Sequence, residues 1–106
     1  MSAQLIVRAQ VYLDLDEIAA YIQKDNPAAA IRFLDAAEAT FQSLAEMPGI
    51  GSSYAVRNAR LSALRCFPVK GFPKHLIFYQ PVGNAIEIVR LLHGARNIGT
   101  ILRREK

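Results

Sequence analysis

The chain has 106 residues, of which 52% are hydrophobic and 21% are charged, and its net charge is +4. This composition is typical of one small globular domain with a single core and excludes a disordered chain. The sequence has no apolar stretch near the roughly 20 residues that a membrane-spanning helix needs. Its first residues do not resemble a secretory signal, and its single cysteine excludes an internal disulfide. We therefore expect one cytoplasmic domain, residues 1–106, without a membrane partner.

A short aliphatic run at residues 5–7 predicts a first strand. Residues 10–24 then show the apolar period of an amphipathic helix, with the acidic side chains off the apolar face. The apolar positions, spaced by four, three and four residues, are Val11, Leu15, Ile18 and Ile22. One face of this helix is therefore expected to pack on the core.

A second helix is predicted after a short break. Asn26 is a favourable N-cap residue, and Pro27 suits the first helical position, where its missing N–H group costs nothing. The apolar period runs to about Met47, and Pro48 with Gly49 ends it. Because the connection is short, we expect an antiparallel helical hairpin. The helix residues assigned to the core are Leu15, Ile18, Phe33 and Phe41.

Three dense apolar runs in the second half of the chain predict three strands, at residues 64–69, 75–80 and 85–92. Turn residues separate them, which indicates an antiparallel meander. Pro68 cannot donate a hydrogen bond to a neighbouring strand, so it marks an edge or a bulge. Residues 48–59, rich in glycine and serine, are predicted to form a loop.

Two local questions stay open from the sequence. Strict alternation places Glu87 and Arg90 on opposite faces of the last strand, unless a bulge lies between them. Residues 98–106 predict either a short C-terminal helix or a basic tail. The expected fold class is α+β, with an N-terminal strand and an antiparallel helical hairpin packed on a small antiparallel β-sheet, in the order β-α-α-β-β-β.

The charge is unevenly distributed along the chain. Residues 1–56 carry three basic and seven acidic side chains, a net charge of −4, whereas residues 57–106 carry ten basic and two acidic side chains, a net charge of +8. Such an asymmetry steers acidic proteins or nucleic acids toward one side of a molecule. The second half is therefore the expected binding surface for a negatively charged partner, although a solvated basic surface without a ligand has the same composition.

The sequence predicts neither a metal nor a cofactor. Two histidines and one cysteine lack the spacing of a metal site, and the six glycines do not form a phosphate-binding loop. Basic residues with one histidine as general acid or base can, however, cleave RNA. The candidate residues for that reaction are Arg60, Arg65, Tyr79, His93 and Arg96. The structural alternatives are a strand-end histidine bound to the backbone and a half-buried core tyrosine.

An ordered set of segments is similar to a known family. The segments are Asp14-Leu15, Ile18, Tyr21-Ile22, Asn26-Pro27-Ala28-Ala29-Ala30, Phe67-Pro68-Val69, Ile77-Phe78-Tyr79, Ile86-Glu87-Ile88 and Leu91-Leu92-His93-Gly94-Ala95-Arg96-Asn97-Ile98. Together they resemble the RelE/ParE superfamily of toxins from bacterial type II toxin–antitoxin systems, most closely its ParE branch. The resemblance covers residues 5–98, and its most specific part is the segment His93-Gly94-Ala95-Arg96-Asn97, which follows a strand rich in Ile and Leu.

The resemblance implies the α+β fold and two protein partners. One is a ParD-like antitoxin with an acidic C-terminal segment, and the other is DNA gyrase, which toxins of the ParE branch inhibit in plasmid stabilisation systems. The alternative is a RelE-like endonuclease that cleaves mRNA on the ribosome, commonly with a C-terminal aromatic residue. No aromatic residue follows Arg96 in this chain. An inactive homologue that still binds antitoxin is the third hypothesis, and direct nucleic-acid binding ranks behind the protein partners.

The residues assigned to partner binding are mainly the basic residues of the second half. The tail from Ile98 onward is the candidate for contact with the target, because a mobile basic end is easily ordered on a partner. The complete set is Arg57, Arg60, Arg65, Lys74, Arg90, Arg96, Ile98, Ile101, Leu102, Arg103 and Arg104.

Overall fold

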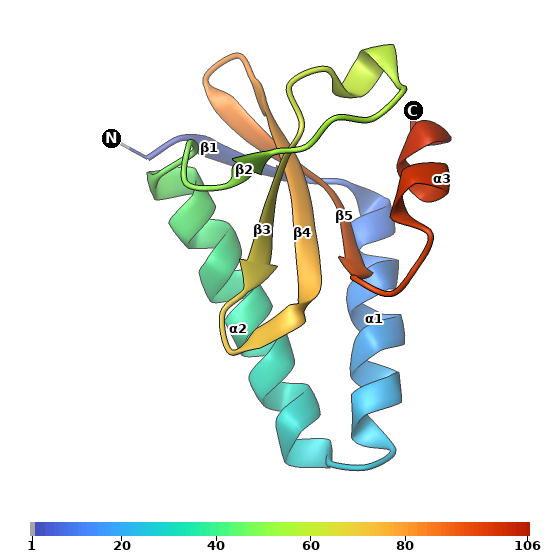
Figure 1. The fold of residues 1–106 in the computed structure, drawn as a ribbon. Helices are drawn as coiled ribbons and strands as arrows, with labels where there is room; N and C mark the ends of the chain where they lie inside the picture. Colours follow the sequence, from blue (N-terminus) through green and yellow to red (C-terminus); the bar gives the residue numbers. More distant parts are fainter. Residues whose placement is uncertain (1) are drawn as a thin grey trace.

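The computed structural model describes residues 2–106, which form an α+β fold (Figure 1). The elements in chain order are β1 (Gln4–Val7), α1 (Ala9–Gln23), α2 (Pro27–Glu46), β2 (Ser52–Ser53), the 3₁₀ turn η1 (Ala59–Leu61), β3 (Arg65–Val69), β4 (Phe72–Val82), β5 (Ala85–His93) and α3 (Ile98–Arg103). No helix within this described part of the chain is long and apolar enough to cross a membrane.

The five strands form one sheet in the order β1-β5-β4-β3-β2. The predicted meander is confirmed, because β3, β4 and β5 pair antiparallel. β1 adds to β5 in parallel, with Gln4 opposite Ala85, so the complete sheet is mixed. Within the predicted loop of residues 48–59 lies the two-residue strand β2, which pairs with β3. The register between β3 and β4 shifts at Pro68, which confirms the expected irregularity there.

The helical hairpin covers one face of the sheet (Figure 1). The Asn26 side chain accepts a hydrogen bond from the Ala29 N–H group at 3.0 Å, which caps α2 as the sequence indicated. Phe33 and Phe41 are buried between the hairpin and the sheet, and Leu15 and Ile18 are half-buried against the same core. In Figure 1 the turn between the helices extends beyond the lower end of the sheet.

A second apolar cluster lies on the opposite face of the sheet. It is formed by side chains of β4, β5, η1 and α3 and of the segment between η1 and β3, namely Leu61, Leu64, Phe78, Val89, Leu92, Ile98 and Leu102. The expected short C-terminal helix is therefore present, but it is not a mobile basic tail. Ile98 and Leu102 were expected to contact the target; Leu102 is instead 0% exposed, because α3 is needed to cover this face of the sheet.

A bulge in β5 settles the orientation of Glu87 and Arg90. Ile88 pairs with Tyr79 and Arg90 pairs with Phe78, so Val89 is an extra residue in β5. One inserted residue reverses the alternation of side chains after it. Glu87 and Arg90 can therefore share one side of the strand, while Ile88 and Leu91 both reach the core under the helices.

Arg90 is not part of a free charged surface, contrary to its assignment from sequence. It is 9% exposed, and its guanidinium donates two hydrogen bonds of 2.9 Å to the carboxylate of Asp14 in α1. The same carboxylate accepts a hydrogen bond from the Leu91 N–H group at 3.1 Å. The hydrogen bonds to Asp14 raise the pKa of Arg90. This buried ion pair joins α1 to β5.

The ion pair continues into a network that reaches the C-terminal residues. Glu105 accepts a hydrogen bond from Arg90 at 3.2 Å and lies 3.9 Å from the Arg8 guanidinium. Arg8 also pairs with Glu87 at 3.1 Å. Burial opposes ionisation of Glu87, but hydrogen bonds from Arg8 and Gln80 outweigh it and lower the pKa of Glu87. The network ties α1 and its N-cap residue to β5 and to the segment that follows α3.

We predict that Asp14→Asn lowers the free energy of unfolding by about 3–5 kcal/mol, because it leaves the buried Arg90 guanidinium without its charge partner. Asp16→Asn, on the exposed face of the same helix, should change it by less than about 0.5 kcal/mol. Urea titrations followed by circular dichroism measure both variants. Equal small changes would contradict a structural role for the ion pair.

We also predict that Leu102→Ala lowers the free energy of unfolding by about 2–5 kcal/mol, because it opens a cavity under α3. Arg103→Ala, at the exposed neighbouring position, is the control and should leave stability nearly unchanged. Thermal unfolding of the two variants gives the comparison. If residues 98–106 were a mobile tail, both variants would unfold like the parent chain.

Candidate functional site

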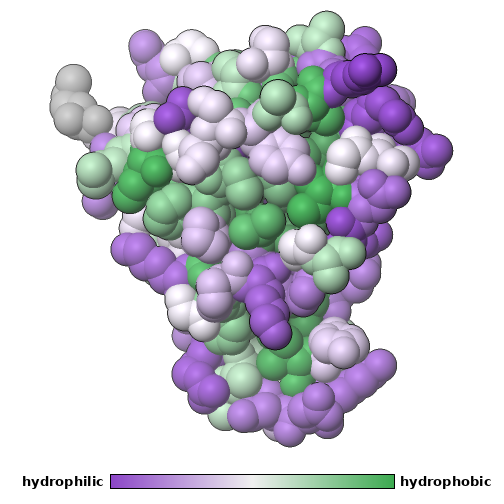
Figure 2. Space-filling model, in the orientation of Figure 1, coloured by the Kyte–Doolittle hydropathy of each residue, from purple (hydrophilic) through white to green (hydrophobic). Residues whose placement is uncertain are grey.

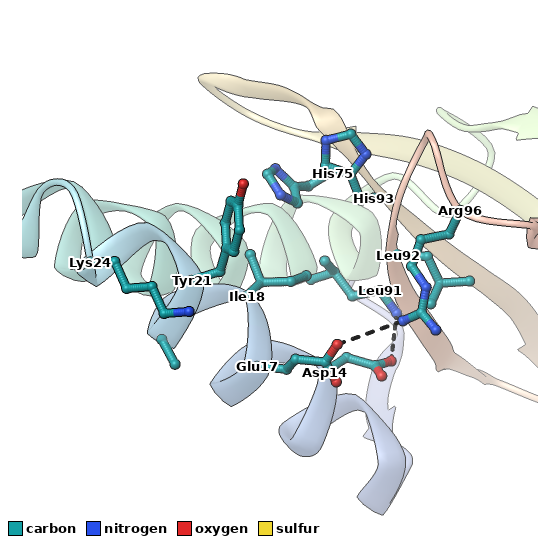
Figure 3. Close-up of a pocket in the computed structure, with 11 residues that line it drawn as sticks. Asp14, Glu17, Ile18, Tyr21, Lys24, His75, Leu91, Leu92, His93 and Arg96 are labelled. Carbon is teal, nitrogen blue, oxygen red and sulfur yellow. Dashed lines mark hydrogen bonds and ion pairs between the residues drawn. The ribbon is translucent and has the colours of Figure 1, made fainter.

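An open groove with a volume of about 420 Å³ lies between α1 and the end of the sheet. It exists because β1 ends at Val7, opposite Ile88, so the rest of β5 has no strand beside it on that edge. The second half of α1 lies there instead. Figure 3 shows the side chains of α1, β4 and β5 that surround this space.

The groove is largely apolar, with charged groups at its rim. Leu91 and Leu92 of β5 and Ile18 of α1 provide aliphatic surface, and Tyr21 stands beside them with 72% of its surface exposed. Around this surface lie Lys24 and Arg96, which are exposed, and Glu17, which is 3.8 Å from the Arg96 guanidinium. Such a groove can receive an apolar side chain whose neighbours carry negative charge.

Two histidines face each other across the strands at one end of the groove. His75 of β4 is directly opposite His93 of β5, and their ring centroids are 5.1 Å apart in an edge-to-face arrangement. The His75 Nδ1 atom is buried without a hydrogen-bond partner. Burial, and secondly repulsion by His93, lower the pKa of His75. Among residues 2–106, no three metal-ligating side chains lie close enough to hold a metal.

His93 is a strand-end histidine that is hydrogen-bonded to the backbone, as one of the structural alternatives from the sequence proposed. Its Nδ1 atom accepts a hydrogen bond of 2.9 Å from the Ala95 N–H group, which stabilises the turn after β5. Its ring nevertheless lines the groove, near Arg96. His93 and Arg96 are thus the predicted site residues that line the groove.

Tyr79 and Arg65 hold a loop rather than face a ligand. Tyr79 is 0% exposed, and its hydroxyl donates to the Pro48 carbonyl at 2.8 Å and accepts from the Gly51 N–H group at 2.9 Å. Arg65, opposite Tyr79 in the sheet, donates to the carbonyls of Gly51 at 3.0 Å and Gly49 at 3.1 Å. Both side chains fix the segment that follows α2, Tyr79 from a buried position and Arg65 from a half-buried one.

The five residues proposed for RNA cleavage therefore do not form one site. Tyr79 and Arg65 lie four residues along the sheet from the His75–His93 pair, a distance of about 13 Å in an extended strand. Arg60 is exposed on η1, and its carbonyl accepts a hydrogen bond from Gln80 at 3.2 Å. No single substrate atom can lie within hydrogen-bond reach of all five side chains.

Most of the remaining predicted partner residues gather at another corner of the molecule. We define the basic surface as Arg57, Arg60, Arg103 and Arg104, which are all exposed. The Asn58 side-chain amide donates hydrogen bonds to the carbonyls of Leu102 at 2.9 Å, Arg103 at 3.4 Å and Glu105 at 2.6 Å, so it joins the loop to the end of α3. In Figure 2 hydrophilic side chains dominate the corner where α3 ends.

The last predicted partner residues occupy other places. Lys74 is exposed at the groove end of β4, where its carbonyl accepts a hydrogen bond from the Gly94 N–H group at 2.7 Å. Ile101 is half-buried beside the second apolar cluster. The predicted surface therefore divides into the groove end, with Lys74 and Arg96, and the basic surface.

A site role was not predicted from the sequence for several of the residues that line the groove. Tyr21, Lys24 and His75 were not assigned to a site, and Ile18 was assigned to the core alone. The only signal for Tyr21 was its place off the apolar face of a predicted helix, where a large aromatic residue has no partner. No pattern in the sequence indicates that the second half of α1 lies beside β5.

The comparisons with known proteins agree with this fold. Residues 5–98 match the family described as ParE toxin of type II toxin-antitoxin system, parDE. A protein of Sinorhizobium fredii (strain NBRC 101917 / NGR234) named "Putative toxin Y4kP" is 33% identical over 79 residues, which cover 74% of this chain and 75% of that protein.

A solved structure supports the fold assignment. The structure titled "Chromosomal ParDE TA system from P. aeruginosa" superimposes with a TM-score of 0.70 and 16% identity, and the match covers 87% of this chain and 96% of that chain. At this identity the likeness concerns the fold. The extent of the family match and the identity to the Sinorhizobium protein carry the conclusion further: the chain belongs to the ParE toxin family of type II toxin–antitoxin systems.

Proposed function

We propose that this chain is a toxin that acts in the cytoplasm by binding DNA gyrase and stopping replication, as part of a plasmid stabilisation system. Its partner in that system is a ParD-like antitoxin with an acidic C-terminal segment. The family membership supports the toxin and the antitoxin. The choice of gyrase binding over mRNA cleavage rests on the arrangement of the candidate catalytic residues.

The separation of those residues is the observation that carries the proposal. Both hydrogen-bonding functions of the Tyr79 hydroxyl are used within the fold, and the side chain is fully buried. Arg65 is committed to two carbonyl groups of the same loop. Residues 97–106 contain no aromatic side chain that could stack on a base. A toxin without a convergent general acid, general base and phosphate site is expected to act by binding.

The groove between α1 and β5 is the surface that suits the antitoxin. Its aliphatic surface and the exposed ring of Tyr21 fit an apolar side chain, and Lys24 and Arg96 fit neighbouring carboxylates. Aromatic residues at the centre of such sites contribute most of the binding energy. An acidic segment is also drawn to the toxin by the net charge of +8 on residues 57–106.

The cellular target is tested by expressing the chain from a tightly regulated promoter without antitoxin, while DNA synthesis and protein synthesis are followed in parallel. We expect DNA synthesis to stop first with translation intact, and purified toxin to inhibit supercoiling by gyrase. Early arrest of translation with cleaved mRNA would instead support the endonuclease. Harmless expression would indicate an inactive homologue that retains antitoxin binding.

The role of the groove is tested with two tyrosines of the same helix. Tyr21→Ala removes an exposed ring from the groove and is expected to weaken antitoxin binding about 30-fold, the effect of losing a hot-spot contact of ~2 kcal/mol. Tyr12→Ala, which also removes an exposed ring from α1 but lies outside the groove, should bind like the parent. Titration calorimetry with the antitoxin segment measures both. Equal affinities would place the antitoxin elsewhere.

A further inference from the structure

The basic surface carries charge that the fold does not neutralise. None of the ion pairs among residues 2–106 includes Arg57, Arg60, Arg103 or Arg104. Glu105 is the single carboxylate between residues 97 and 106. Its oxygens are already bound by Arg90 at 3.2 Å and approached by Arg8 at 3.9 Å. The four guanidinium groups therefore keep their full charge for a ligand.

The fold also holds together the two segments that carry Arg57 and Arg103. Arg57 and Arg103 line one hollow of about 300 Å³ together with Asn97 and Thr100, and the half-buried Tyr54 and Val56 also contribute to its lining. The three hydrogen bonds of the Asn58 amide connect the two segments that carry the arginines. Burial of Leu102 anchors the helix from which Arg103 extends. The backbone segments that carry these two arginines are thus in place before a ligand arrives, so no loop has to be ordered on binding.

The chemistry of this surface favours phosphate over a protein partner. No exposed large apolar side chain lies in residues 52–61 or 97–106, whereas several lie on the helices. Protein interfaces are centred on apolar or aromatic anchors, while interfaces with DNA are polar and strongly positive. Arginine additionally matches phosphate oxygens with two parallel hydrogen bonds. The apolar groove and the basic surface therefore suit different classes of ligand.

We propose that the basic surface binds the phosphodiester backbone of duplex DNA without reading its sequence. The inference rests on the proposed function in one respect: gyrase holds duplex DNA, so a toxin docked on gyrase gains affinity from this contact. Arg57 and Arg103 form the centre of the contact, and Arg60 and Arg104 extend it. The DNA contact itself requires no gyrase, so it can be measured on the purified toxin alone.

The direct test is fluorescence anisotropy of a labelled 20-base-pair duplex with purified full-length toxin between 50 and 200 mM salt. With four phosphate contacts, the affinity is expected to fall roughly 150-fold over this range, from a slope of about −0.9 per contact. Arg57→Gln combined with Arg103→Gln should reduce the magnitude of the slope by about 2. A slope near zero, or no binding at 50 mM salt, would overturn the proposal.

A charge-matched variant separates the surface from the net charge. Arg32→Gln with Lys70→Gln removes the same charge at exposed positions outside the basic surface and should keep the parental slope. Equal losses in both double variants would overturn the assignment, as would a glutamate-rich peptide, or a single-stranded RNA of equal length, that binds tenfold more tightly than the duplex. Matching thermal unfolding curves confirm that the variants are folded.

The same variants distinguish this inference from the proposed function. If the parent inhibits gyrase but shows no binding to duplex DNA, the inference fails and the proposed function stands. If the duplex binds with the expected slope while gyrase keeps its full supercoiling activity, the DNA contact stands and the gyrase assignment fails. If the toxin both inhibits gyrase and binds the duplex, the variant with Arg57→Gln and Arg103→Gln should lose at least tenfold more gyrase inhibition than the charge-matched variant.

Discussion

The ion pair between Asp14 and Arg90 is the interaction on which the rest of the structure depends. It joins residues 76 positions apart in the sequence and is shielded from solvent on both sides. A buried ion pair contributes little net stability, because desolvation of the charges offsets their attraction. It does fix geometry, since any other placement of α1 leaves two charges and the Leu91 N–H group unsatisfied. The position of α1 in turn determines the width of the groove, and Arg90 also orients Glu105 at the end of α3.

The uneven charge of the sequence is used both inside the fold and on its surface. The acidic first half supplies Asp14 to Arg90 and Glu17 to Arg96, so two of the ten cations in the second half are matched by the helices. The cations farther from the hairpin receive no such partner. Among residues 2–106, the acidic residues of the first half thus neutralise the cations near α1 and leave those near the end of α3 unpaired. As a result, the apolar groove and the basic surface lie at different places on the molecule.

Local patterns were sufficient for the two long helices and the three main strands but not for β2 or η1, and distant contacts explain what these patterns did not predict. The apolar period, the Asn26 cap and the turn residues located both helices and the three-stranded meander. Arg90 resembled a surface charge because its partner lies on another element, and no local pattern pairs it with Asp14. Ile98 and Leu102 span about one helical turn, too short a repeat to distinguish a packed helix from a tail. The groove belongs to neither α1 nor β5 alone, so it was not predictable from either.

The parallel pairing of β1 with β5 has a consequence for the order of events during synthesis. Because Gln4 pairs with Ala85, the first strand is translated early and stays unpaired until some eighty further residues have been synthesised. Contacts between residues so far apart in the sequence form slowly, and until they form the unpaired segments are exposed to solvent. The groove, bounded by α1 and the last part of β5, exists only after His93 has left the ribosome. The segments that build the groove therefore stay exposed to proteases until the residues up to His93 have been synthesised, and a partner that recognises the groove can bind only after that point.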